Sequence, residues 1–536
     1  AVHCTTPESR SSTKPYVAPT PEVPKSEIAN AAPARVGLVG QVATARATDR
    51  VFEVRGVSEV PLAATPGTPP LPAVPLKAAT VTPGPTALFD TDPLADYPDV
   101  NVAVSTTHVC VSNRGAFGCY TKAGVPIVLV AGQPAGQISA FNFFTAAGVK
   151  FGQIADCKSD AVKDGRIVFD QSTRHFFVAF QSRELPVRLL IAASKTENPT
   201  DGWYVYADDL SAIGMNGADY HWIGVNSTHL LLTEQLASGC TLICGPDAGA
   251  NTCSPTKTYH LSYTLVDLIN GLTPTRGVWK DPAAESAVPA IHDTTTTDAF
   301  YVHRDDGADV TIWAVRNGGV YKSAPIPVKL AVNPTNDFGP SDAGQCGALM
   351  MFTNIGMAPQ NVEFRDGRLL AVSNVGNVWS PPTVNDAVHL MRFNVLTFFG
   401  IPGQPIVGVD VDRIFGRAES TDPPGTVFDY GWPAVATNAN ADIVIGSVRN
   451  NCTTGTELRS SVFFYTTQPD ISESALLQRS DNVLQEWHMA GAAADPSSSA
   501  VYLAQQYTRA GIARARVTKM LGVLAPDILA TQVSIP

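Results

Sequence analysis

Residues 164 to 206 read DGRIVFDQSTRHFFVAFQSRELPVRLLIAASKTENPTDGWYVY. This segment holds four short apolar runs, which begin near Arg166, Phe176, Leu189 and Trp203 and are separated by turn-forming residues. Runs of this length that are rich in branched and aromatic side chains are typical of β-strands. The pattern therefore predicts one four-stranded antiparallel sheet. Because a single small sheet cannot bury both of its faces, other sheets must pack against it.

Similar groups of strand-like runs recur along the rest of the chain. They occupy residues 101–130, 164–206, 220–265, 287–330, 362–393, 432–465 and 485–517. We predict an all-β protein, a β-propeller of seven blades, with six or eight blades as alternatives. Seven blades over this span need roughly 60 residues each, more than propeller repeats usually have, so long loops are expected. Helix is nearly absent, and residues 264–271 are the best candidate for a short one.

The chain divides into two regions of different composition. Residues 1–95 are rich in Pro, Ala, Thr and Val, which predicts an extended N-terminal arm, and residues 96–536 form the predicted propeller. Two strand-like runs interrupt the arm, beginning at Val36 and Val51. We expect them to add to an exposed sheet edge, either of this chain or of a neighbouring copy.

The overall charge limits the classes of partner. The formal net charge is -11, and no cluster of Lys and Arg provides the basic surface that nucleic acids and anionic membranes require. The sequence contains no run of eighteen apolar residues, so we expect no membrane span. It begins at Ala1 without methionine, which we interpret as a mature chain that is secreted or held at the cell surface.

One pair of cysteines has the spacing of a β-hairpin. A two-residue turn at Arg114 and Gly115 would place Cys110 directly opposite Cys119, where strands approach most closely. In an oxidising compartment this arrangement predicts a disulfide; the alternative is two independent buried thiols.

The other cysteines that we single out lie in less regular sequence. Cys240, Cys244 and Cys253 occupy a loop rich in Gly, Pro and Ser and are candidates for a further disulfide. They are not favoured as a zinc site, because no fourth ligand follows at a suitable spacing. Nine cysteines leave at least one unpaired in a monomer, so Cys4, near the end of the arm, is a candidate for an intermolecular link.

Several segments together resemble a known family. They read DGRIVFD at 164–170, LIAASKTENPTDGWY at 190–204, DYGWPAVATNANADIVIG at 429–446 and VFFY at 462–465. Over residues 98 to 520 the chain resembles a family of secreted, mostly bacterial β-propeller proteins whose function is poorly defined. The resemblance implies the fold and a secreted location. It brings no catalytic residues with it, and the arm lies outside it.

The segment from Ser194 to Trp203 loosely resembles the Asp-box of sialidase-type propellers, with a Ser, an Asp, a Gly and a Trp at longer spacing. In propellers that motif stabilises a turn between outer strands. We therefore interpret this segment as a hairpin turn with Trp203 packed between blades.

Acidic residues are available for catalysis or for metal binding. Glycoside hydrolysis needs two carboxylates a few ångströms apart, and acid pairs occur at Asp208–Asp209, at Asp305–Asp306 and at Asp410 with Asp412. None has an identifiable partner in the sequence, so we interpret them as solvated charges. Asp305, Asp306 and Asp309 are weak candidates for a structural calcium site, since they lack the spacing of an EF-hand. No other cofactor is expected.

These observations favour a non-catalytic protein, without excluding an enzyme. GxSxG, HExxH, Walker and GxGxxG motifs are absent. We expect a structural or interaction subunit of a surface layer, sheath or filament, whose arm contacts another copy or another surface protein. The alternatives are a carbohydrate-active hydrolase or lyase working in the propeller funnel and a ligand-binding or adhesion propeller. An enzyme would need acidic, aromatic and basic side chains to converge at one mouth of the funnel.

Overall fold

A computed structural model describes most of the second region of the chain. The described residues are 99–151, 162–182, 187–215, 218–238, 254–281, 287–293, 296–304, 309–329, 358–380, 383–399, 406–416, 422, 428–439, 441–451, 455–464, 470–471, 475–479, 490–509 and 512–520, with short strands at 34–35, 49–51, 89–90 and 530–531. Cys4, Cys240, Cys244, Cys253, Asp305 and Asp306 lie outside them.

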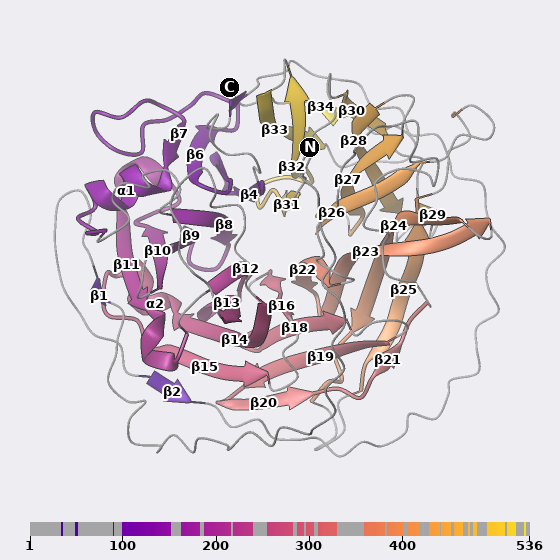
Figure 1. Ribbon diagram of the computed structural model, residues 1–536, viewed down its shortest axis with the longest axis horizontal. Coiled ribbons are helices and arrows are strands. Elements are labelled where there is room, and N and C mark those ends of the chain that lie inside the picture. The colour runs from indigo at the N-terminus through magenta and orange to yellow at the C-terminus, as the bar shows by residue number, and fades with distance from the viewer. Residues whose placement is uncertain are drawn as a thin grey trace, which may run out of the picture.

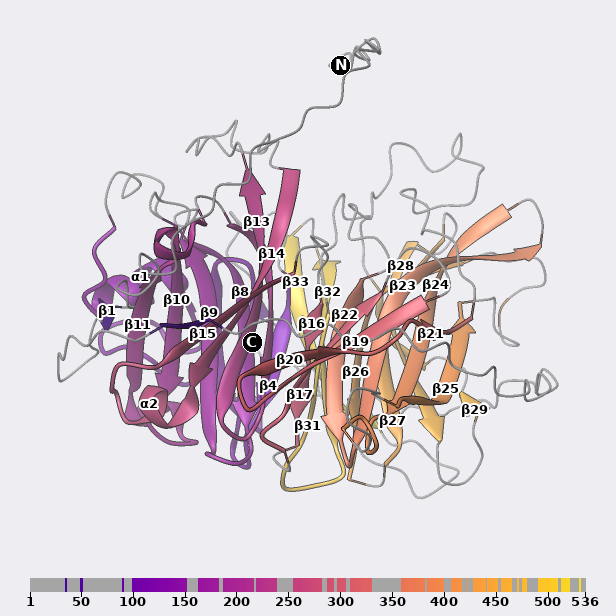
Figure 2. The ribbon, with the colours of Figure 1, turned by 90° about the horizontal axis from the view of Figure 1, so that it is seen from below.

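The described chain is all-β, as predicted, and its sheets stand around a common centre like the blades of a propeller (Figure 1). The first unit is a run of antiparallel hairpins made of β4 (Asn101–Val104), β5 (His108–Ser112), β6 (Ala116–Thr121) and β7 (Gln137–Ser139). Figure 2 shows the strands of such units running roughly along the axis of the ring.

The second unit is the sheet predicted from residues 164 to 206. Its strands are β8 (Val162–Asp170), β9 (His175–Ser182), β10 (Arg188–Ser194) and β11 (Trp203–Asp209), paired antiparallel in chain order. The turn before β11 is the packing device that was expected. Ser194 Oγ donates to the carbonyl of Thr196 and accepts from the backbone N–H of Phe176. Trp203 is buried against Phe117 and Phe143 of the preceding unit.

The remaining units repeat this arrangement. The next holds β12 (Ala218–Val225), β13 (His229–Ser238), β14 (Ser254–Thr264) and β15 (Arg276–Asp281). It is followed by β16 (Val288–Pro289), β18 (Ala299–Arg304), β19 (Asp309–Arg316), β20 (Gly319–Lys322) and β21 (Ile326–Pro327). Then come β22 (Pro359–Arg365), β23 (Arg368–Ser380), β24 (Thr383–Asn394) and β25 (Gly408–Phe415).

Two more units complete the described chain. One holds β26 (Asp429–Thr437), β27 (Ile443–Asn451), β28 (Gly455–Phe464), β29 (Asp470–Ile471) and β30 (Ala475–Arg479). The other holds β31 (Gly491–Ala494), β32 (Val501–Arg509), β33 (Ile512–Met520) and β34 (Ala530–Thr531). A short strand, β17 (Ile291–His292), pairs in parallel with both β12 and β22 and so joins two units into one sheet.

The core lies between the units rather than inside any of them, because each sheet buries its faces against its neighbours. The first and last units also pack together: Val102 and Val109 share an apolar cluster with Tyr502 and Val517. Backbone approach is close there, since a Cβ added at Gly491 would lie 2.7 Å from the backbone nitrogen of Val102. A salt bridge of 2.6 Å from Lys122 to Asp495 links the same two units.

Three short strands of the N-terminal region pair with the outer edges of this same chain. β1 (Ala34–Arg35) pairs with β11, β2 (Asp49–Val51) with β15, and β3 (Phe89–Asp90) with β33. Of the two strand-like runs expected to add to a sheet edge, the one beginning at Val36 lies outside the described residues, while Val51 belongs to β2, which pairs with β15 of this same chain. Contact with a neighbouring copy stays a prediction.

The hairpin cysteines form a disulfide. Cys110 and Cys119 are opposite each other on β5 and β6, with their Cα atoms 4.1 Å apart. The helices are short: α1 (Ala140–Ala146) covers the first unit, and α2 (Leu265–Ile269) lies where a helix was expected. No helix among the described residues is long and apolar enough to cross a membrane.

Candidate active site

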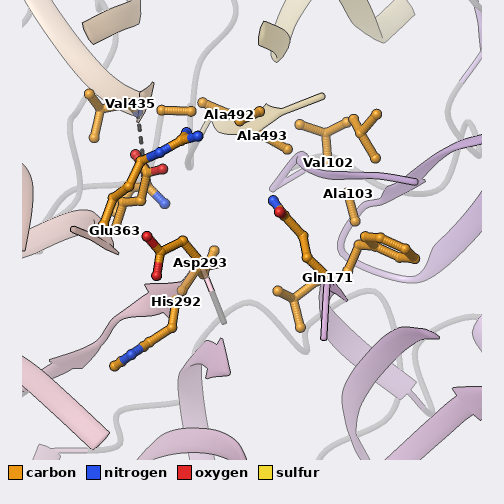
Figure 3. Close-up of a pocket in the computed structure, with 17 residues that line it drawn as sticks. Val102, Ala103, Gln171, His292, Asp293, Glu363, Val435, Ala492 and Ala493 are labelled. Carbon is orange, nitrogen blue, oxygen red and sulfur yellow. Dashed lines mark hydrogen bonds between the residues drawn. The ribbon is translucent and has the colours of Figure 1, made fainter. Parts of the chain in front are cut away.

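A pocket lies at the centre of the ring, where the inner strands end (Figure 3). We call it the axial pocket. Its walls come from the carboxyl-terminal parts of β4, β8, β22, β26 and β31 and from β17 with the residue after it. Most of the wall is apolar, formed by Val, Ala, Ile and Phe side chains. The polar side chains that line it are Gln171, His292, Asp293, Asn361, Glu363 and Arg365.

Glu363 lies on β22 and is held by the neighbouring unit. Its Oε2 accepts a hydrogen bond of 2.6 Å from the backbone N–H of Thr437, at the end of β26. Burial raises the pKa of Glu363 to about 7, against the lowering effects of Arg365 and of the bonds from Thr437, while Asp293 raises it further. At neutral pH this carboxyl group can therefore both hold and release a proton.

Asp293 reaches the same pocket from a different part of the chain. It follows β17, whose parallel pairing places Ile291 opposite Glu363. Asp293 Oδ2 accepts from the backbone N–H of Asp366 at 3.0 Å, and the backbone N–H of Asp293 donates to Phe364. Figure 3 shows its carboxylate directed into the space between Glu363 and Gln171.

Arg365 supplies the positive charge of the pocket. It lies two residues after Glu363 on β22 and acts electrostatically on that carboxyl group. One of its N–H groups, on Nη1, donates to the carbonyl oxygen of Thr437 at 2.6 Å. A guanidinium group has five N–H donors, so this bond uses one of them.

A larger cavity adjoins the axial pocket and shares three lining residues with it, Gln171, Arg365 and Ala494. Its volume is about 310 Å³, against about 50 Å³ for the axial pocket. The other residues that line it are Ala439, Asp495, Pro496, Ser497, Ser498 and Ser499. The adjoining cavity therefore has the size of a small-molecule site, whereas the axial pocket alone is smaller than that.

His292 lines the axial pocket without serving as a base in it. Its ring stacks on Phe364, with centroids 4.7 Å apart, and burial lowers its pKa to about 3. Figure 3 shows the ring directed away from Asp293 and Gln171. A histidine that stays neutral and points away from the cavity is part of the wall.

The acidic residues singled out from the sequence lie elsewhere. Asp208 is buried, with both of its oxygens accepting from Arg276 Nη1, and Asp209 caps a short turn through a bond to the N–H of Ser211. Asp410 pairs with Arg368, and Asp412 accepts from His389. Asp309 begins β19. Among the described residues no three His, Cys, Asp or Glu side chains are grouped as a metal site.

The pocket acids were missed by sequence reasoning, although one signal was present. In β22, Asn361, Glu363 and Arg365 alternate with the apolar Val362 and Phe364. Alternate residues of a strand point to the same side, so this pattern indicates a polar face on an inner strand. Asp293 offered no such signal, because it follows a strand of only two residues.

A second group of buried charges lies at the opposite ends of the inner strands. This amino-end cluster consists of Asp99, Asp164, Arg166, His221 and Glu234, with relative exposures between 0% and 5%. A β-bulge in β8 shapes it: Asp164 has a φ of 60°, and a Cβ on Gly165 would lie 2.4 Å from the carbonyl oxygen of Asn113.

The charged groups of the amino-end cluster act electrostatically on one another and form hydrogen bonds to the neighbouring strands. Arg166 Nε donates to the carbonyl of His221 at 3.0 Å, and Glu234 accepts from Gln181. Burial raises the pKa of Asp99 to about 7, and burial lowers the pKa of His221 to about 3.

Comparisons with known proteins give no family assignment. No family model and no curated protein matches the sequence. Solved structures with a similar arrangement include the Hadza microbial sialidase Hz136 (11% identity, 79% of this chain and 76% of that chain, TM-score 0.35). The NanB sialidase of Streptococcus pneumoniae has 8% identity over 77% of this chain and 82% of its own, with a TM-score of 0.36. A polysaccharide lyase, an ulvan lyase, has 10% identity over 83% of each chain and a TM-score of 0.29.

These comparisons correct one expectation from the sequence. A non-catalytic structural subunit of a surface assembly was expected, but the named neighbours are carbohydrate-active enzymes. The expectation rested on the absence of a recognisable catalytic motif. Side chains that come together from separate strands, as the acids of the axial pocket do, form no local motif.

Proposed function

We propose that this protein is a carbohydrate-active enzyme that hydrolyses glycosidic bonds in the axial pocket. The observation that carries the proposal is the meeting of two carboxyl groups and a cation at one end of the ring, namely Glu363, Asp293 and Arg365. This is the convergence that an enzyme working in the funnel would need. Burial raises the pKa of Glu363 to about 7, which suits a proton donor at neutral pH.

Each carboxyl group has a separate role in this scheme. Glu363, in its protonated form, donates its proton to the glycosidic oxygen as the bond to the leaving sugar breaks. Asp293 acts from the end of the neighbouring strand β17, either by taking a proton from the attacking water or by attacking the anomeric carbon itself. Arg365 stabilises the negative charge that remains on Glu363 after proton transfer.

The shape of the site fits a saccharide better than a small acyl or phosphoryl substrate. The larger adjoining cavity offers room and is lined by Ser497, Ser498 and Ser499, while the smaller axial pocket holds the two acids. A sugar bound in the adjoining cavity would bring its glycosidic bond to Glu363 and Asp293 in the axial pocket. The sugar would then be bound by the polar side chains of one cavity and cleaved by the carboxyl groups of the other.

The test is to replace the carboxyl group of Glu363 by the amide of glutamine, which cannot donate a proton as an acid. Turnover of a panel of oligosaccharides would be measured for the full chain and for Glu363→Gln, which keeps an acceptor for the N–H of Thr437. We expect kcat/KM to fall by about 10²–10⁴-fold, the usual contribution of a general acid. The matched control is Glu197→Gln, which makes the same change at a salt bridge to Arg174, neither residue of which lines the axial pocket or the adjoining cavity, and should leave turnover unchanged.

Two results would count against the proposal. Full turnover in the Glu363→Gln variant would remove Glu363 from the chemistry. Binding of glycans without turnover by the unmodified protein would instead favour a ligand-binding propeller. Circular dichroism and thermal unfolding of each variant would show that the fold is retained.

We also propose that the sheets are the blades of a closed seven-bladed propeller. Among the described residues five sheets hold one antiparallel unit each and the ten-stranded sheet holds two. The packing of Val102 against Tyr502 between the first and last units supports closure. The disulfide between Cys110 and Cys119 supports an extracellular location, since such bonds persist in oxidising compartments.

A further inference from the structure

The adjoining cavity adds a feature that bears on which saccharides the proposed site would bind. Among the described residues that line the two cavities, Arg365 is the one side chain with a permanent positive charge. It lines the axial pocket together with the proposed catalytic acids, and it lines the adjoining cavity together with Ser497, Ser498 and Ser499. Its guanidinium group is therefore shared by the place of bond cleavage and the place where a sugar would bind.

The acid in the adjoining cavity is already neutralised. Asp495 accepts from Lys122 Nζ at 2.6 Å, from the backbone N–H of Ser497 at 2.8 Å and from the hydroxyl groups of Ser497 and Ser498. The pKa of Asp495 lies below its usual value, with burial opposed by the bonds from Lys122 and the two serines. Its charge is thus matched by its own partners, and Arg365 is left to determine which ligands the cavity favours.

We propose that the adjoining cavity binds the anionic group of an acidic saccharide, a carboxylate or a sulfate, through Arg365. This inference rests on the proposed glycoside-cleaving function and specifies its substrate class. The planar guanidinium fork matches the two oxygens of a carboxylate, and charged hydrogen bonds of this kind are about twice as strong as neutral ones. The opposing view is that Arg365 is only the counterion of Asp293 and Glu363.

Binding of single sugars tests the proposal, because the cavity has the size of a small-molecule site. The probes are D-glucuronate, D-glucose 6-sulfate and neutral D-glucose, and their dissociation constants would be measured by ligand-observed NMR with the full chain. The protein would carry Glu363→Gln, so that binding is measured apart from turnover. We expect at least one acidic sugar to bind about 10-fold more tightly than glucose.

Substitution of the arginine identifies the group that is recognised. Arg365→Gln should remove the preference for the acidic sugar and leave the affinity for glucose within about two-fold. Arg365→Lys should keep more of the affinity for the sulfate than for the carboxylate, since only the latter needs the paired N–H groups. Arg174→Gln changes an exposed arginine and is the matched control.

The failure of this inference and that of the proposed function have different signatures. If neither acidic sugar binds better than glucose, or if Arg365→Gln weakens all three probes equally, the anionic preference is wrong even when Glu363 proves essential for turnover. If Arg365→Gln abolishes a clear preference but Glu363→Gln retains turnover, the cavity binds acidic sugars and the proposed chemistry is wrong.

Discussion

The two ends of the inner strands carry similar groups in different surroundings. The axial pocket places Glu363 and Arg365 beside a cavity, whereas the amino-end cluster packs Asp99, Arg166 and Glu234 inside the protein with exposures of at most 3%. In both places burial raises the pKa of an acid to about 7. A perturbed pKa therefore does not by itself mark an active site; access for a ligand must accompany it.

The largest expected effect is on the pH dependence of catalysis, which should depend on Glu363 in the axial pocket and not on Asp99 in the amino-end cluster. If Glu363 is the proton donor, kcat/KM should fall as pH rises through about 7, because the carboxyl group then loses its proton. Two pH units above that value the loss should reach about 100-fold. A pH–rate profile measures this loss of kcat/KM. Asp99→Asn should leave the pH at which kcat/KM begins to fall unchanged. A profile that is flat from pH 6 to 9 would contradict the assignment.

The next effect is on the free energy of unfolding, compared between Arg166 of the amino-end cluster and Arg365 of the axial pocket. Arg166→Met would remove the cation that acts most strongly on the buried carboxyl group of Asp99, and breaking a buried pair in this way costs about 3–5 kcal/mol. Arg365→Met should cost less than about 1 kcal/mol, because its side chain is partly exposed at the cavity. Urea unfolding of both variants gives the comparison. Equal losses would mean that Arg365 is as structural as Arg166.

A smaller effect appears in the pH dependence of stability. Because the pKa of Asp99 is raised on folding, the folded chain binds a proton that the unfolded chain has released, and stability falls as pH rises from about 4 to 7. Asp99→Asn removes this contribution, so its stability relative to the unmodified protein should increase over that interval.

One pKa unit corresponds to about 1.4 kcal/mol, so the difference should reach at least that figure. Unfolding at pH 4.5 and pH 8 measures it. His221 has the opposite sign, since its pKa is lowered and its contribution is lost as pH falls below about 6.5. The unmodified and Asn variants share that contribution, which therefore cancels. A difference that does not change with pH would exclude Asp99 as the titrating group.

The comparison also shows what sequence patterns reveal. The sheet at 164–206, the turn before Trp203 and the disulfide of Cys110 with Cys119 were predictable, because strand period and hairpin spacing are local properties. The axial pocket was not, since Asp293 and Glu363 meet only through the parallel pairing of β17 with β22. That pairing crosses from one unit to another.

The smallest effect concerns a pocket residue whose role we assign to structure. Asn361 Oδ1 accepts from the backbone N–H of Val435 at 3.0 Å and so joins β22 to β26 beneath the proposed acids. Asn361→Ala would leave that N–H without its acceptor and should cost about 1–2 kcal/mol. Because Asn361 neither holds nor moves a proton in the scheme, the alkaline limit of the pH–rate profile should stay near 7 and kcat should change less than ten-fold. A shift of that limit would mean that Asn361 controls the protonation of Glu363. The pKa of Glu363 would then depend on the hydrogen bond between β22 and β26 as well as on burial.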